Sequence, residues 1–312
     1  MIKIKPLHNN IKLCCVICSD THIDIEHPYK WMPKMRLKNC LKDSQKSENE
    51  IDAFIINGDT TSHSIKENWN MAVECFEKIE NPAKQVILAV GNHDCWSDTT
   101  FEEARDTYFR YYEKICGKRI EKTYFSYCLN GYKFIFLGNE SASGCGAVIS
   151  DEQIEWFKKE IEEGSQKNKP VFVFCHQSLN QKHGLPYTWD KEKKDYPPEE
   201  GGIGEKSEEI EQIMKSYKNI FYFSGHSHMG FLGEKSLKKN GYSSIYEENG
   251  LTLINTPSVS CGNHDGEYNR FACGIVLEVY DDKVVIRPRD FKKRKFINIK
   301  IKDSKPYFEK EI

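Results

Sequence analysis

The sequence predicts an α/β fold in which strands and helices alternate along one continuous domain. Short apolar runs with the length of buried strands alternate with helix-like stretches through the first two-thirds of the 312 residues. The part after residue 240 is rich in strand signals separated by turn residues. No internal repeat or low-complexity linker divides the chain, so we expect one domain over residues 1–312.

The first half of the chain supplies three strand–helix pairs. Trp69, Val73, Phe76 and Ile79 are spaced to line one face of a helix. The expected strands cover 11–18, 52–57 and 85–90, and the expected helices cover 33–47, 66–80 and 100–116.

A hairpin and a capped helix follow. Asn130-Gly131 is a strong hairpin signal because both positions tolerate positive φ, and it predicts paired strands over 123–129 and 132–138. Ser150 and Gln153 have the spacing of a capping box that begins the next helix. Further strands are expected over 171–175, 220–223, 250–254, 272–279 and 283–288, with a helix near 206–217. We expect a mixed sheet arrangement.

Two segments stand apart from this pattern. Residues 177–205 are polar, carry His183, Tyr187 and Trp189, and are interpreted as a lid insertion or a mobile loop. Residues 291–312 are expected to form a C-terminal extension, with the basic run 292–295 on the solvated face of a late edge strand.

Composition and charge narrow the function classes. Apolar residues make up 38% of the chain, a composition typical of globular proteins. The net charge of −2 provides no electrostatic field that would steer the chain onto nucleic acid or an anionic membrane. No stretch is long enough to cross a bilayer and no targeting segment is recognised, so a cytoplasmic protein is the expectation. The oligomeric state is open.

The twelve cysteines lie mostly inside apolar runs, as free buried thiols in a reducing compartment do. Cys15 and Cys18 form a C-x-x-C, for which a redox or zinc role is an alternative. No second C-x-x-C completes a zinc site, and the pair lies within a strand-like run, so we favour the strand interpretation.

Five polar blocks each fall where an expected strand ends. Because the carboxyl ends of strands in an α/β sheet converge on one crevice, side chains distant in sequence can meet there. In two blocks the polar residues are two apart, which on an extended backbone places them on one side. The blocks are Asp20-Thr21-His22, Gly58-Asp59, Gly91-Asn92-His93-Asp94, His176 and Gly225-His226-Ser227-His228.

The side chains in these blocks suit a pair of metal ions. Imidazoles, carboxylates and one amide oxygen, without a thiolate, favour Mn, Fe, Co, Ni or Zn. A carboxylate can bridge two cations, which makes Asp59 the natural shared ligand. The glycines before Asp59, Asn92 and His226 are expected to let the backbone turn sharply.

In this order the five blocks resemble the calcineurin-like metallophosphoesterase superfamily, including its cyclic-nucleotide phosphodiesterase-like members. The resemblance covers roughly residues 11–290. It implies a four-layer α-β-β-α sandwich of two mixed sheets with the metals at the strand ends. It also implies hydrolysis of a phosphate ester, a small diester or monoester such as a cyclic nucleotide, by water activated between two metal ions.

The same resemblance assigns roles to individual residues. Asp20, His22, Asp59 and His228 would hold one metal, and Asp59, Asn92, His176 and His226 the other. His93 would face the substrate unligated and Asp94 would lie behind it, where it could hold the His93 tautomer.

The residues after the G-D block distinguish this chain from two other branches of the superfamily. Ser/Thr protein phosphatases carry an arginine soon after the G-D block, and purple acid phosphatases a tyrosine where this chain has Ser62, so neither class is expected. The alternatives left open are a nuclease of the same superfamily and a catalytically silent scaffold.

Ordinary loop packing is favoured over substrate contact for Trp96, His63, Glu140 and Arg270, and a surface turn is favoured for Asn263-His264-Asp265.

Overall fold

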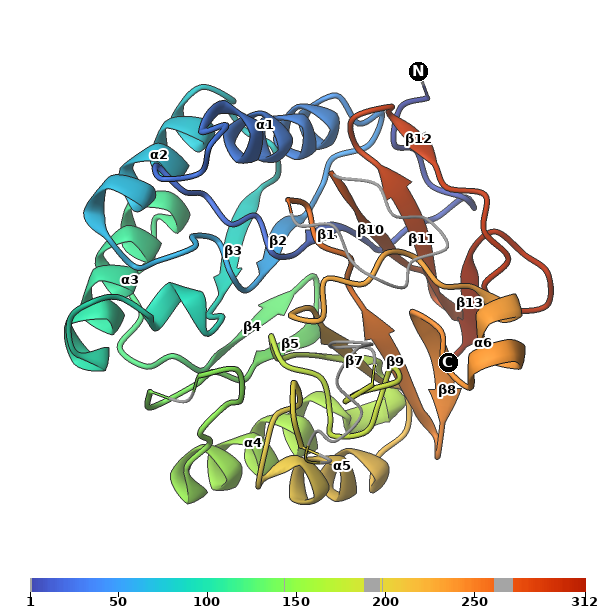
Figure 1. Cartoon of the computed structure of the whole chain (residues 1–312). Helices are drawn as coiled ribbons and strands as arrows, with labels where there is room; N and C mark the ends of the chain where they lie inside the picture. Colours follow the sequence, from blue (N-terminus) through green and yellow to red (C-terminus); the bar gives the residue numbers. More distant parts are fainter. Residues whose placement is uncertain (1, 143, 188–196, 198, 261–271) are drawn as a thin grey trace.

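Two β-sheets lie face to face between two groups of helices in the computed structural model (Figure 1). The structure describes residues 2–142, 144–187, 197, 199–260 and 272–312. In Figure 1 the helices α1, α2 and α3 lie on one side of the molecule, and α4 and α5 lie on the other. This is the four-layer α-β-β-α sandwich of two mixed sheets that the family resemblance implied.

The first sheet has the order β12-β11-β10-β1-β2-β3, and β13 pairs with β11. Three strands are parallel and carry the predicted strand–helix units: β1 (Leu13–Cys18), β2 (Ala53–Asn57) and β3 (Gln85–Ala89). The remaining strands are β10 (Cys273–Val279), antiparallel to β1, then β11 (Lys283–Asp290), β12 (Lys295–Phe296) and β13 (Phe308–Glu311).

The second sheet has the order β4-β5-β6-β7-β9-β8. Its hairpin β4 (Phe125–Leu129) and β5 (Tyr132–Phe136) turns at Asn130-Gly131, as predicted, and both turn residues have positive φ. The parallel centre continues through β6 (Val171–Phe174), β7 (Ile220–Ser224) and β9 (Leu251–Asn255), and β8 (Ile245–Glu248) is the antiparallel edge.

The helices cover the outer faces of the sheets. Helices α1 (Trp31–Gln45), α2 (Lys66–Glu77) and α3 (Phe101–Cys116) belong to the first sheet, and α4 (Asp151–Gly164) and α5 (Ser207–Lys215) to the second. The shorter elements are α6 (Glu234–Asn240) and the 3₁₀ turns η1 (His93–Cys95) and η2 (Gln166–Asn168). None of these helices is long and apolar enough to cross a membrane.

Alternation along each strand produces three separate apolar layers, which accounts for the four-layer stack. In β1, Cys14, Val16 and Cys18 pack with the helices, whereas Cys15 and Ile17 pack between the sheets. The predicted strand therefore holds, and Cys15 and Cys18 face opposite ways as free, buried thiols. They cannot form one redox or zinc site. The third layer lies between the second sheet and helices α4 and α5.

The predicted cap of α4 is only half formed. Ser150 Oγ accepts the backbone N–H of Gln153 at 3.1 Å, but the Gln153 side chain donates to the Gly138 carbonyl and to Glu140 instead of returning to Ser150. Glu140 accepts from the backbone N–H of Ser150 at 2.8 Å and takes that role. The packing interpretation of Glu140 is thereby supported.

The C-terminal segment is less separate than the sequence suggested. Within residues 291–312, β12 and β13 both pair with β11 and so extend the first sheet. Lys292, Lys293 and Arg294 form the turn between β11 and β12. Strand β12 itself has two residues, so the basic run does not lie on the face of a long edge strand as expected. Elements α6 and β8 were not predicted, because they are short and polar.

Six phenylalanines line the inner face of the second sheet and fill the space between the sheets. Phe172 is fully buried, and its ring lies 4.8 Å from that of Phe134 and 5.4 Å from that of Phe221. The other members are Phe136, Phe174 and Phe223. Burial of these rings holds the two sheets together.

Phe172→Ala is expected to lower the free energy of unfolding by about 3–5 kcal/mol, since it removes a buried ring from a layer that cannot collapse between two sheets. Denaturant unfolding measures the change. Tyr29→Ala, which removes an aromatic side chain exposed at 58%, serves as the control and should shift stability by less than about 0.5 kcal/mol. A loss below about 1 kcal/mol in Phe172→Ala would show that the aromatic layer is not rigidly packed.

Candidate metal centre

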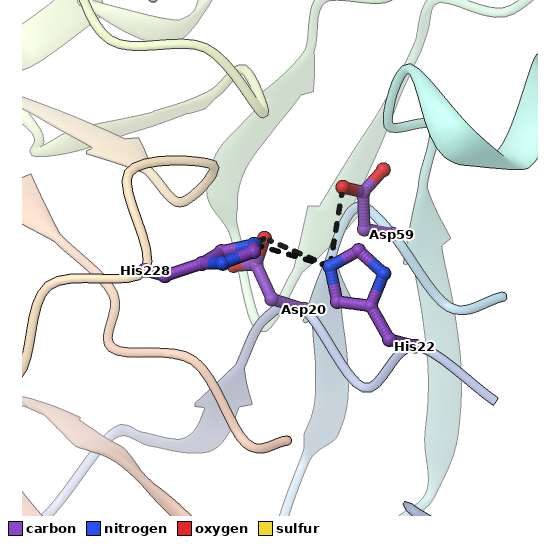
Figure 2. Close-up of side chains that lie close together, drawn as sticks. All are labelled: Asp20, His22, Asp59 and His228. Atoms are coloured by element: carbon purple, nitrogen blue, oxygen red, sulfur yellow. Dashed lines mark hydrogen bonds and ion pairs between the residues drawn. The ribbon is translucent and has the colours of Figure 1, made fainter. Parts of the chain in front are cut away.

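Side chains from four strand ends converge on one buried point. Asp20, His22, Asp59 and His228 each offer a ligand atom within 4.8 Å of the others (Figure 2). Asp59 belongs also to a second such group, with His176 and His226. Asp20 and His22 follow β1, Asp59 follows β2, His176 follows β6, and His226 and His228 follow β7. The centre thus draws on both sheets.

The distances between these atoms suit ions bound at their common centre. Metal–ligand bonds of about 2.0–2.2 Å place neighbouring ligand atoms roughly 3–4 Å apart. In the first group, His228 Nε2 lies 3.1 Å from both Asp20 Oδ1 and His22 Nε2, and His22 Nε2 lies 3.6 Å from Asp59 Oδ2. In the second group, His176 Nε2 lies 3.0 Å from Asp59 Oδ2.

The backbone at these positions is unusual. Asp20, His22, Asp59, His226 and His228 all have φ between 43° and 62°. This left-handed region is uncommon for residues other than glycine and costs of order 1–3 kcal/mol when it is imposed. The side chains therefore converge through left-handed turns, and the extended backbone assumed for the D-x-H and H-x-H blocks is wrong.

The glycines in the motifs have two different purposes. Gly58 has φ of 87°, as expected of a sharp turn, and a Cβ there would also strike the His176 ring. Gly91 and Gly225 do not have positive φ; a Cβ would instead overlap the Asp59 carboxylate at Gly91 and the Ser19 side chain at Gly225. These two glycines are required for space, which corrects the expectation of a sharp turn at each.

Asn57, the last residue of β2, orients one of the candidate ligands through hydrogen bonds. Its carbonyl accepts the Nδ1–H of His176 at 2.8 Å, which leaves His176 Nε2 to face the carboxylates. Its side-chain amide donates to the carbonyl of Phe223 at 3.2 Å, so one residue links β2 to the second sheet. Such a second layer of hydrogen bonds fixes the tautomer and the direction of a ligating imidazole.

Buried atoms without partners test whether the site fits metal ions. Among the described residues, Asp20 Oδ1, Asp59 Oδ2 and Asn92 Oδ1 are buried and accept no hydrogen bond. Polar atoms are rarely left this way in a native protein unless an unseen ion or water satisfies them. The donor set of carboxylate, amide oxygen and imidazole therefore fits the two metal ions that the family resemblance implied.

Charge in the centre is balanced between carboxylates and imidazoles. Burial alone would raise the pKa of Asp20 and Asp59, but the neighbouring histidines, His176 above all, hold both well below the usual range. Burial would lower the pKa of His176, yet Asp59 and Asp20 raise it to about 9. Burial and His176 lower the pKa of His226 to about 3.

His93 and Asp94 lie at the edge of the centre, but Asp94 is not the partner of the His93 ring. His93 Nδ1 lies 2.7 Å from the Ser62 carbonyl, to which it donates. Asp94 accepts the backbone N–H groups of Thr61 at 3.1 Å and Gly91 at 3.0 Å. Asp94 therefore connects the Asp59 loop to the Asn92 loop. The carbonyl of Ser62, which no sequence motif marks for this role, fixes the His93 tautomer.

The remaining sequence-selected residues divide between packing and exposure. His183 is buried and its Nδ1 donates to the Ser243 carbonyl at 2.9 Å, so it does not face the entrance as the lid hypothesis required. Trp96 is exposed, and its ring lies 5.0 Å from His93 and 5.3 Å from His63. Arg270, Asn263-His264-Asp265, and residues 188–196 of the suggested lid, including Trp189, lie outside the described residues.

Comparison with known proteins matches residues 15–230 to the family described as Calcineurin-like phosphoesterase. The chain belongs to this family. Among solved structures it is similar to a dimetal phosphatase from Danio rerio, with 11% identity over 90% of this chain and 97% of that one, and a TM-score of 0.59. No curated protein matches.

A second similar structure is the purple acid phosphatase PPD1 from yellow lupin, Lupinus luteus, with 13% identity and a TM-score of 0.61. The alignment covers 95% of this chain but 53% of the lupin chain, about half its length. Likeness at these identities shows a shared fold and no more.

Gly91→Ala is expected to remove bound metal while the sheets stay folded, because the added Cβ would lie 2.1 Å from the Asp59 carboxylate and 2.4 Å from the Asp59 backbone nitrogen, so the Asp59 loop must move. Metal analysis of the purified variant, together with circular dichroism, measures both effects. Gly117→Ala is the matched control, since nothing lies within 4 Å of a Cβ there although φ is 67°. Full metal content in Gly91→Ala would contradict the geometry described for Asp59.

Proposed function

We propose that this calcineurin-like phosphoesterase hydrolyses small phosphate esters, diesters or monoesters, with two metal ions held at the strand ends. The observation that carries the proposal is the Asp59 carboxylate, which belongs to both groups of ligand atoms and has a buried oxygen that accepts no hydrogen bond from any described residue. A carboxylate shared in this way is what a pair of adjacent cations requires.

Asp20, His22, Asp59 and His228 would hold one ion. Asp59, His176 and His226, joined by the Asn92 amide oxygen, would hold the other. Two such cations supply an activated water and neutralise charge on the phosphoryl oxygens. The absence of thiolate favours Mn, Fe, Co, Ni or Zn.

His93 is proposed to act on the substrate. Its Nδ1–H is fixed to the Ser62 carbonyl, so its Nε2 is the atom left for the substrate. In the protonated ring, Nε2–H can donate to the oxygen of the departing alcohol. Asp94 is proposed as a positioning residue, because its two backbone contacts hold the Asp59 and Asn92 loops together.

Two other functions receive less support. A nuclease needs a basic groove along the nucleic-acid backbone, and a net charge of −2 offers no excess of positive charge to build one. A silent scaffold would have no need of six side chains in strained or buried positions whose ligand atoms lie within 4.8 Å of one another in two groups. A cyclic nucleotide is one member of the proposed substrate class.

Asp59→Asn is expected to lower the metal content from two equivalents towards none and to reduce hydrolysis of a chromogenic phosphodiester by at least about a hundredfold. The physical reason is that both ions lose the same negative ligand. Asp281→Asn, at an exposed carboxylate, is the control and should behave as the native protein does. Two full equivalents of metal with normal turnover would rule out Asp59 as the shared ligand.

His93→Ala is expected to keep both metals and to slow hydrolysis by about a hundredfold or more for esters of poorly acidic alcohols. The loss should be smaller for nitrophenyl esters, because their leaving group departs without a proton. Rates for a series of esters, with metal content measured in parallel, test this. Equal losses across the series would point to positioning of the phosphoryl group, and loss of a metal would assign His93 to the ligands.

A further inference from the structure

A pocket of about 300 Å³ opens directly beside the metal centre. One wall is made by Asn92 and His93, and the others come from the residues around η1, the start of α3 and the loop after β5. The side chains that matter to its chemistry are Trp96, Phe101, Asn139 and Cys145. The pocket therefore begins where the ester would be cleaved and extends away from the ions.

The lining offers little to a charged group. None of the described residues that line the pocket is Asp, Glu, Lys or Arg. The amide of Asn139 is already engaged, since its Oδ1 accepts the backbone N–H of Val148 at 2.7 Å and its Nδ2 donates to the Ser141 carbonyl. Burial raises the pKa of the Cys145 thiol, which keeps it neutral. An uncharged group would lose less hydration here than a second phosphate would.

Trp96 provides a flat surface in this pocket. Its side chain is 54% exposed, although large aromatic side chains are normally covered. Its backbone is fixed, because its carbonyl accepts the N–H of Ser64 at 2.7 Å and its N–H donates to the His93 carbonyl at 3.3 Å. The rings of His63 and His93 flank it at 5.3 and 5.0 Å. An exposed indole on a fixed backbone, beside the His93 ring, offers a face on which another ring can stack.

We propose that this pocket binds the departing alcohol of the substrate, and that the preferred substrates are phosphate esters whose alcohol carries an uncharged aromatic ring. Aryl alcohols and nucleosides share this chemistry. The inference rests on the proposed function. In the reaction the water oxygen bonds to phosphorus, the ester P–O bond breaks, and the alcohol oxygen receives a proton on the His93 side of the pocket. A volume at the lower end of the range for ligand sites suits one ring system.

The test compares benzyl phosphate with ethyl phosphate, whose alcohols are similarly weak acids and differ by the ring. The metal-loaded native protein should favour benzyl phosphate by about tenfold or more in kcat/KM. Trp96→Ala should lower the ratio of kcat/KM for benzyl phosphate to that for ethyl phosphate by about tenfold, and Trp96→Phe should retain most of this preference. A carboxylate on the benzyl ring should weaken the substrate. Trp31→Ala, at a tryptophan of similar exposure, is the control.

Binding of benzylphosphonate and ethylphosphonate, measured by calorimetry, separates the pocket from catalysis because neither compound has an ester bond to hydrolyse. Hydrolysis of both phosphates with equal kcat/KM would overturn the pocket assignment and leave the proposed function standing. Absence of hydrolysis of both monoesters and of a chromogenic phosphodiester by the metal-loaded protein would overturn the proposed function. Tighter binding of benzylphosphonate, lost in Trp96→Ala, would then still support the pocket, and equal binding of both phosphonates would overturn it as well.

Discussion

The hydrogen bond from His176 Nδ1–H to the carbonyl of Asn57 joins the two sheets at the point where their central strands end. It brings a ligand from the second sheet onto Asp59, the carboxylate that follows the first. The contact tolerates no side chain at Gly58, because a Cβ would strike the His176 ring. The Asn57 amide adds a second link to the Phe223 carbonyl. The spacing of the sheets is therefore fixed at the site, and the aromatic layer behind it must match that spacing.

The phenylalanine layer between the sheets meets this requirement. Phe174 stacks on Phe223 with 4.6 Å between ring centroids, directly before the residues that lead to His176 and His226. Close-packed rings between two sheets transmit small displacements, since interiors have few voids to absorb them. Rigidity in this layer is what keeps ligand atoms from opposite sheets 3.0 Å apart without direct strand pairing.

Sequence patterns predicted the layers well because the layers follow general rules. The apolar run within residues 11–18 predicted a strand that the structure confirms, and the Asn130-Gly131 turn predicted the pairing of β4 with β5. Short polar elements such as β8 were missed, because they have no apolar period to detect. Near the metal centre the motif residues were predicted, but their backbone conformation was not. The left-handed φ at Asp20 and His226 is imposed by tertiary contacts and is not encoded in the local preference of these residue types. The same holds for Ser62, whose contribution is a backbone carbonyl that every residue type possesses.

The candidate metal centre combines backbone strain with buried charge, and both favour the binding of metal ions. Five residues other than glycine are held at positive φ, and two carboxylates are kept ionised in full burial by nearby imidazoles. Each such feature opposes folding on its own, by of order 1 kcal/mol or more. Metal ions that bound the folded arrangement and not the unfolded chain would add their binding free energy to stability and offset this strain. The pre-formed geometry thus opposes folding of the chain when no metal binds. It also lowers the reorganisation that metal binding would otherwise require.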